Sequence, residues 1–122
     1  MAVFFSAYDK RIKASVSNCW CLNYKNSLKK KFKTRIPMEM VVPNILGYCD
    51  YGDIVKLVNP CHLLISVAKK DKWSRDAKEI YKYAKNKFKN SELILKIWPG
   101  DHRFSKEMRN KAYKFLIEKL KN

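Results

Sequence analysis

Two short apolar runs, each followed by a helical pattern, constrain the fold of this chain more than any other feature. They cover residues 63–68 and 93–98, and turn-forming residues flank both of them. Short runs of this kind are typical of strands buried on both faces, as in a parallel sheet. Strands that alternate with helices predict such a sheet with right-handed crossovers. The sequence therefore predicts an α/β fold.

The first part of the chain adds one strand and a long loop. Residues 1–8 are apolar and predict the end of a helix, with no capping residue ahead of it. Residues 12–19 alternate in polarity and carry β-branched side chains, which predicts a strand. Residues 20–47 are irregular, and a loop of this length is typically functional, for example as a cap over a site. Its candidate lining residues are Tyr24, Phe32, Met38 and Met40. Packing of these side chains under the loop is an equally good interpretation.

Three capped helices complete the pattern. Asp50 opens the first, and Asn59-Pro60 ends it. Ser74 and Ser105 are expected to cap the other two. Their apolar residues recur at three- and four-residue spacing, which predicts two inner stripes: Ala77, Ile80, Tyr81, Ala84 and Phe88, and then Met108, Ala112, Phe115, Leu116 and Leu120. We expect one partial α/β domain over residues 1–122, with about three parallel strands and flanking helices.

Lysine rather than arginine carries the large positive charge. The chain has 27 Lys and Arg against 11 Asp and Glu, a net charge of +16. Only 5 of these basic residues are Arg, and both halves of the chain carry an excess of positive charge. Nucleic-acid readers rely on Arg and gather their charge on one stripe. We therefore expect only non-specific, salt-sensitive binding to nucleic acid, and we favour a solvated surface over a phosphate-binding patch for the Lys-rich residues 29–33.

The four cysteines stand at spacings that predict free thiols. One residue between Cys19 and Cys21 is too few for a zinc knuckle, and Cys61 and His62 would point to opposite faces of a strand. We therefore expect no metal site and no cofactor. Free thiols, including Cys49, favour a reducing cytoplasmic location. The sequence has no apolar run long enough for a membrane span and no signal-peptide pattern at its start.

Two loops that follow the buried strands carry residues suited to chemistry. Asp71 comes three residues after Ala68, and His102 comes four residues after Trp98. Ligands of open α/β sheets bind beyond the carboxyl ends of the strands, where neighbouring strands lie about 5 Å apart. Asp71 would then orient His102 as a general base. The alternative interpretation is a turn-forming Asp71 and a solvated His102.

Residues 63–73 and 98–108 resemble the C-terminal part of the α/β-hydrolase superfamily, and within it the dienelactone hydrolase and acetyl xylan esterase-like branch. Residues 100–104 read Gly-Asp-His-Arg-Phe, which is similar to the family's Gly-x-His-x-Phe pattern. Residues 8–16 resemble the family segment that leads from the nucleophile helix into the next strand. The resemblance implies a hydrolase of carboxylic esters in which Asp71 is the triad acid and His102 is the triad base.

The chain departs from this family at the nucleophile. The family places its serine in a Gly-x-Ser-x-Gly elbow, whereas glycine occurs here only at positions 47, 52 and 100. The resemblance puts the elbow and the oxyanion hole before Met1, so we expect this chain to be inactive alone. It also implies an open edge on the first strand, where an N-terminal hydrolase half or a second copy would bind. A thiol nucleophile from Cys19 or Cys21 is a less favoured substitute.

Two other functions remain as alternatives. A non-catalytic interaction module would keep the fold and an apolar patch, and no added chain would restore activity. A basic nucleic-acid-binding protein would gather its charge on one face and bind with a steep dependence on salt.

Overall fold

A three-stranded parallel sheet lies at the centre of the structure, a computed structural model that describes residues 1–29, 36–37 and 41–121. The strands are β1 (Ala14–Asn18), β2 (His62–Ala68) and β3 (Leu93–Trp98), and their order across the sheet follows the chain. Val16 pairs with Leu64, and Leu64 pairs with Ile94. The prediction of an α/β fold with three parallel strands is confirmed.

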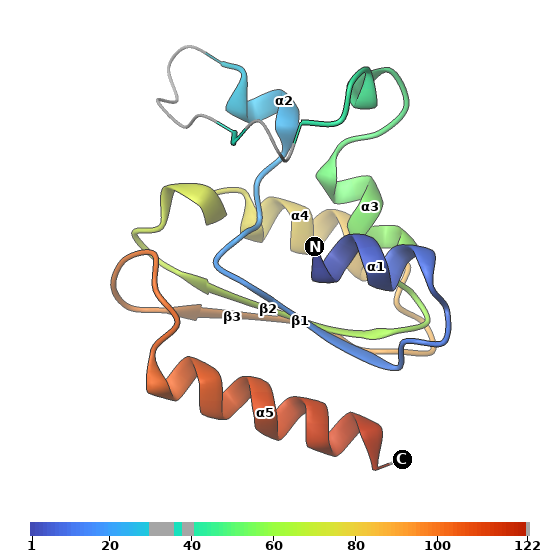
Figure 1. Cartoon of the computed structure of the whole chain (residues 1–122), viewed down its shortest axis with the longest axis vertical. Coiled ribbons are helices and arrows are strands. Elements are labelled where there is room, and N and C mark those ends of the chain that lie inside the picture. The colour runs from blue at the N-terminus through green and yellow to red at the C-terminus, as the bar shows by residue number, and fades with distance from the viewer. Residues whose placement is uncertain (30–35, 38–40, 122) are drawn as a thin grey trace.

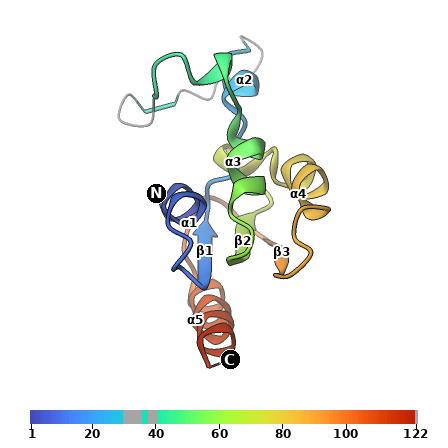
Figure 2. The same ribbon diagram turned by 90° about the vertical axis from the view of Figure 1, so that its right-hand side faces the viewer.

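Helices cover both faces of this sheet (Figures 1 and 2). One layer contains α1 (Ala2–Tyr8), α3 (Tyr51–Leu57) and α4 (Ala77–Lys85). The helix α5 (Lys106–Leu120) lies on the opposite face, against β1 and β2. Three short elements connect these helices and strands: α2 (Tyr24–Ser27), η2 (Ile45–Gly47) and η3 (Lys72–Ser74).

The helix starts show which local predictions hold. The Asp50 carboxylate accepts the Tyr51 N–H and forms a capping box with Asp53, so α3 begins where expected. The Ser105 hydroxyl accepts the Met108 N–H at 3.3 Å and caps α5, also as expected. The prediction that Ser74 caps the next helix is wrong. That helix, α4, begins after Asp76.

The middle strand carries most of the core. Residues 63–68 of β2 are all buried, because β2 has a strand on each side and a helix layer on each face. The prediction that β3 is equally buried is wrong, since only Leu93 of that strand is buried. The reason is its place at one edge of the sheet, where α5, which packs on β1 and β2, covers it less well.

The two helical stripes are buried for most of their length. Three residues of each stripe are buried: Ala77, Ile80 and Ala84 in α4, and Met108, Ala112 and Phe115 in α5. The expectation of an inner position for Leu120 is wrong, because this side chain is exposed. At 3.6 residues per turn, Leu120 lies roughly 140° around the helix from Phe115, which takes it off the buried face.

The region expected to be an irregular loop contains one turn of α-helix, α2, and the turn η2. Of the four side chains expected to line a site there, Tyr24 is buried in the core. The other three, Phe32, Met38 and Met40, lie outside the described residues, as do the lysines at positions 30, 31 and 33.

The four cysteines are free, as expected, and Cys19, Cys21 and Cys61 are buried. Burial raises the pKa of each of these three thiols, so they are protonated at neutral pH. Among the helices of the described residues, none combines the length and the apolar character needed to cross a bilayer.

Candidate catalytic site

Backbone hydrogen bonds hold together the loops that follow β2 and β3. The Lys69 N–H donates to the Trp98 carbonyl at 2.8 Å, and the Lys70 N–H donates to the Gly100 carbonyl at 3.0 Å. These bonds continue the pairing of the two strands beyond their carboxyl ends. The loops therefore run side by side, and the residues that follow, Asp71 and His102, meet.

Asp71 and His102 make the contact expected from the sequence. The Nδ1 atom of His102 lies 3.1 Å from Oδ1 of Asp71. The Asp71 side chain is 0% exposed, whereas the His102 side chain is 56% exposed. With Nδ1 directed to the carboxylate, Nε2 is the ring nitrogen left for a substrate or a nucleophile. This is the arrangement that a general-base histidine requires.

The buried Asp71 carboxylate is held by its own loop. Its Oδ1 accepts the Trp73 N–H at 2.9 Å, and its Oδ2 accepts the Ser74 hydroxyl at 2.7 Å. A buried carboxylate is costly unless such donors satisfy it. Ser74, expected to cap a helix, instead fixes the orientation of Asp71. The Trp73 ring stacks on Trp20 with ring centroids 5.6 Å apart, which joins this loop to the segment after β1.

Cys19 is the third residue at this edge of the sheet with a side chain that can take part in chemistry. It follows β1 directly, and its N–H donates to the Ser66 carbonyl at 2.9 Å. Its backbone adopts a left-handed φ of 54°, and its thiol donates to the Arg103 carbonyl at 2.9 Å. One donor atom each from Cys19, Asp71 and His102 lies within 4.8 Å of the other two. The sequence placed Cys19 near the end of a strand, but not in contact with the other two residues.

The thiol of Cys19 is not activated as a nucleophile. Burial raises its pKa, and the negative charge of Asp71 raises it further. Reactive cysteines are instead partly exposed thiolates in electropositive surroundings. The other thiol considered from the sequence, Cys21, is fully buried in the core.

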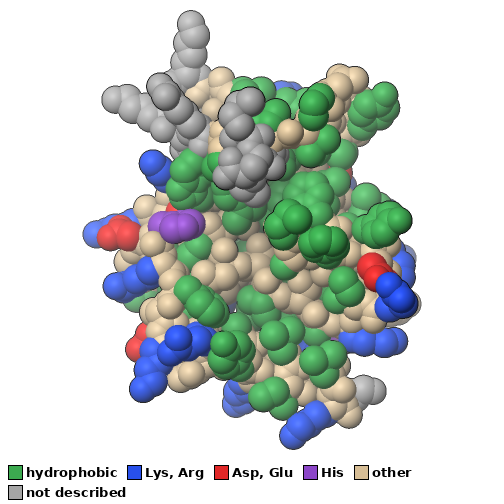
Figure 3. Space-filling view, in the orientation of Figure 1, with side chains coloured by type: hydrophobic (Ala, Val, Ile, Leu, Met, Phe, Trp, Pro, Cys, Tyr) green, Lys and Arg blue, Asp and Glu red, His purple; other side chains and the backbone are tan. Residues whose placement is uncertain are grey.

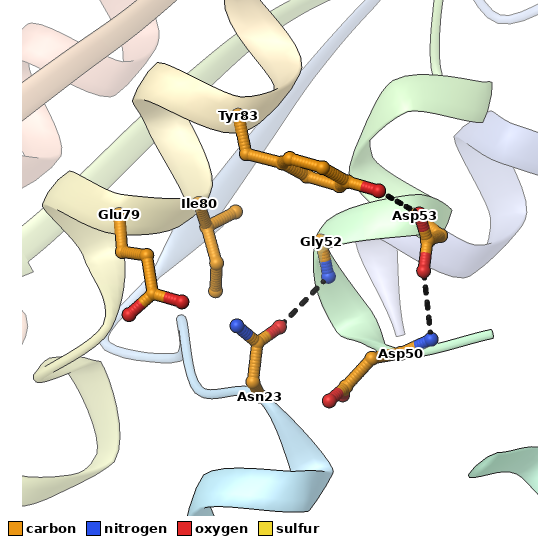
Figure 4. A pocket seen from close by; sticks show the side chains of 7 residues that line it. All are labelled: Asn23, Asp50, Gly52, Asp53, Glu79, Ile80 and Tyr83. Carbon is orange, nitrogen blue, oxygen red and sulfur yellow. Dashed lines mark hydrogen bonds between the residues drawn. The ribbon is translucent and has the colours of Figure 1, made fainter.

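A separate pocket of about 220 Å³ lies among α2, α3 and α4 (Figure 4). Its lining residues are Asn23, Asp50, Gly52, Asp53, Glu79, Ile80 and Tyr83. Two hydrogen bonds connect lining residues to one another. The Gly52 N–H donates to Asn23 Oδ1 at 3.0 Å, and the Tyr83 hydroxyl donates to Asp53 Oδ1 at 2.7 Å. These bonds join three helices, and neither Asp71 nor His102 lines the pocket.

Comparison with known proteins adds no relative. No protein-family model matches this chain, and no curated protein matches it in sequence. The geometry at the carboxyl edge of the sheet is therefore the main basis for a functional conclusion.

Proposed function

We propose that this chain supplies the acid and the base of a Ser-His-Asp hydrolase site, as the C-terminal part of an α/β-hydrolase-fold esterase. The observation that carries the proposal is the 3.1 Å contact between His102 Nδ1 and Asp71 Oδ1, formed by loops that leave adjacent parallel strands. A carboxylic ester as substrate rests on the resemblance to that family.

Each of the two residues has a defined role in this reaction. His102 Nε2 would take the proton from a serine hydroxyl as the serine oxygen attacks the ester carbonyl. Asp71 would keep the other proton on Nδ1 and stabilise the imidazolium that forms. The imidazolium would then give its proton to the leaving alcohol, and water would repeat the sequence on the acyl-enzyme. Backbone N–H groups of the proposed N-terminal half would hold the oxyanion.

The unpaired side of β1, at the edge of the described sheet, is an observation in favour of a partner that completes the site. Among the described strands, β1 pairs with β2 alone. Hydrophobic side chains gather on the face where β1 and α1 lie in front (Figure 3; compare Figure 1). On α1, Phe5 is 56% exposed and Tyr8 is 89% exposed. An N-terminal hydrolase half would cover this edge with its own strands and bring the serine.

The test combines this chain with the polypeptide encoded directly upstream in its genome. Hydrolysis of p-nitrophenyl acetate is measured for each chain alone and for the mixture, with EDTA present throughout. We expect background rates from the single chains and hydrolysis from the mixture. His102→Ala should lower the rate of the mixture by about 10⁴-fold, since removal of one triad member leaves little more than transition-state binding.

His62→Gln is the matched control, because the only other histidine lies at the opposite end of β2. It should leave the rate of the mixture unchanged. The proposal is overturned if the mixture is inactive and the upstream polypeptide contains no Gly-x-Ser-x-Gly elbow.

An interaction module is the second candidate function, and the exposed Phe5 and Tyr8 beside an open strand edge favour it. This candidate predicts that the two chains form a stable complex without esterase activity. Both functions predict a complex in size-exclusion chromatography of the mixture, and the esterase assay of that complex separates them.

A further inference from the structure

We propose that Cys19, Asp71 and His102 form a zinc-binding site at the carboxyl edge of the sheet. One sulfur, one carboxylate oxygen and one imidazole nitrogen lie within 4.8 Å of one another there. Zn²⁺ takes all three kinds of donor in proteins. The three residues follow β1, β2 and β3 in turn, so the parallel sheet itself gathers them.

The separations between the donor atoms suit a tetrahedral ion. Zinc bonds of about 2.0–2.3 Å place neighbouring ligand atoms roughly 3.4–3.6 Å apart. His102 and Asp71 stand at 3.1 Å, close to this value. The longest separation in the cluster is no more than 4.8 Å, so it needs to shorten by at most about 1.2 Å. Because His102 and Asp71 are already close, this separation runs to the Cys19 sulfur, and the half-exposed His102 side chain has room to adjust toward an ion there.

The surroundings of the ligands also suit an ion. Metal-bound carboxylates are normally oriented by hydrogen bonds from a second layer of residues. Trp73 and Ser74 already hold the Asp71 carboxylate in this way. When zinc displaces its proton, Cys19 becomes a thiolate, and together with the carboxylate it balances the charge of the ion.

An unpaired buried oxygen stands beside the cluster. The Oδ1 atom of Asn18 is buried and has no hydrogen-bond partner among the described residues. Asn18 directly precedes Cys19, and its side chain interacts with the thiol. Three protein ligands leave the fourth position of zinc to water. A water on the ion is a donor of the kind that this oxygen lacks.

The zinc site does not rest on the proposed esterase function, although it uses the same Asp71 and His102. A zinc ion would occupy both residues and remove the general base. Zinc should therefore inhibit the completed hydrolase. Binding itself is measurable on this chain alone, so the two proposals stand or fall separately.

The experiment titrates the purified, reduced chain with Zn²⁺ in competition with a chromophoric chelator. Co²⁺ then replaces zinc as a spectroscopic probe of the ligands. We expect one equivalent of zinc and a sulfur-to-cobalt charge-transfer band in the near ultraviolet. Cys19→Ser, Asp71→Asn and His102→Gln should each weaken zinc binding by more than about 100-fold, which exceeds the roughly 10–100-fold loss expected from an altered second-layer partner. Cys19→Ser should also abolish the charge-transfer band.

Matched controls use the same residue types outside the cluster. Cys49→Ala and His62→Gln should leave the affinity and the cobalt spectrum unchanged. Circular dichroism checks the fold of every variant, and the exposed His102 offers a substitution that leaves the core intact. The proposal is overturned if the chain does not compete with the chelator, if His102→Gln binds zinc normally, or if a control variant loses binding.

Discussion

Two groups of carboxylates in this molecule use the same chemistry for opposite purposes. At the carboxyl edge of the sheet, Asp71 is fully buried and one of its oxygens faces the half-exposed ring of His102. Between α2 and α3, the Asp50 carboxylate accepts backbone N–H groups: those of Tyr24 at 2.6 Å, Tyr51 at 2.7 Å and Lys25 at 3.2 Å, and that of Asp53 in the capping box. A carboxylate filled by backbone donors builds the fold. One that also faces a titratable side chain is available for chemistry.

The Asp50 carboxylate joins α2 to α3 through the hydrogen bonds from Tyr24 and Lys25. Asp76 extends the same joint, since its Oδ2 accepts the Asn23 N–H at 2.9 Å and the Asn26 amide at 3.1 Å. Short helices such as α2 are unstable alone, because nucleation costs more than a few hydrogen bonds return. We infer that these carboxylates hold α2 in place.

The largest effect should come from Asp50→Ala. This change removes the acceptor for the N–H groups of Tyr24, Lys25, Tyr51 and Asp53, and with it the N-cap of α3. We expect the free energy of unfolding to fall by about 3 kcal/mol, from one lost cap and buried donors left unpaired. Urea denaturation measures it. Asp101→Ala, at an exposed position, is the control and should change stability by less than about 0.5 kcal/mol.

Gly100→Ala should come next, and it tests how the site is positioned. Gly100 has a φ of 97°, and a Cβ there would lie 2.7 Å from an Arg103 guanidinium nitrogen. Strained backbone of this kind costs about 1–3 kcal/mol in a residue with a side chain. We expect a loss of about 2 kcal/mol in the free energy of unfolding, with weaker zinc binding, because His102 follows two residues later.

Gly47→Ala is the control for that strain. The nearest atom to a Cβ at this position is Oδ1 of the flexible Asn44 side chain, at 3.0 Å, and no left-handed φ is needed. Its stability should change by less than about 0.5 kcal/mol, and zinc binding should not change. Equal losses in both variants would show that strain at Gly100 is not the cause.

Asp71→Asn should sharpen the contrast between the two carboxylates. The amide keeps the shape of the carboxylate and one acceptor oxygen, so Trp73 or Ser74 keeps a partner. We expect a loss of about 1 kcal/mol in the free energy of unfolding, smaller than that of Asp50→Ala, together with loss of zinc binding. If Asp71→Asn destabilised the chain more than Asp50→Ala, the division into structural and functional carboxylates would be wrong.

The smallest effect should come from Tyr83→Phe, which removes one donor to Asp53. The Asp50 N–H and then the Tyr83 hydroxyl hold the pKa of Asp53 below its usual value of 3.8. A lowered carboxyl pKa contributes stability above 3.8, and that contribution is lost as the pH falls through the folded-state pKa. We expect a loss of about 0.5 kcal/mol near neutral pH that shrinks in acid. Urea denaturation of both proteins from neutral to acid pH tests this prediction. A difference in the free energy of unfolding that stays constant with pH would contradict the role given to the Tyr83–Asp53 hydrogen bond.

Much of the fold follows from local signals. Asp50 and Ser105 cap helices because a short polar side chain before an apolar stripe satisfies the first N–H groups. β2 is buried on both faces, as its short and mostly apolar run predicts. The same reasoning gave a wrong prediction for Ser74. A serine before a helix has the same sequence pattern whether it caps that helix or, as here, donates to a carboxylate.

The burial of the edge strand β3 could not be predicted without the tertiary structure. A run of five apolar residues interrupted by Lys96 predicted a buried β3, yet the edge position of that strand leaves most of it half-covered. The residue type of the exposed Lys96 records part of this in the sequence, but the partial exposure of its apolar neighbours depends on what packs around the strand. The same limit applies to Tyr24, which packs in the core of the domain.

By itself, the sequence determined the alternation of strands and helices, and with it the placement of Asp71 and His102 after neighbouring strands. Periodicity and turn residues act over a few positions, so they can be read locally. Only the tertiary structure decided that Cys19 joins them. The 51 positions between Cys19 and Asp71 carry no signal of contact, and the register of three parallel strands brings their ends to one edge.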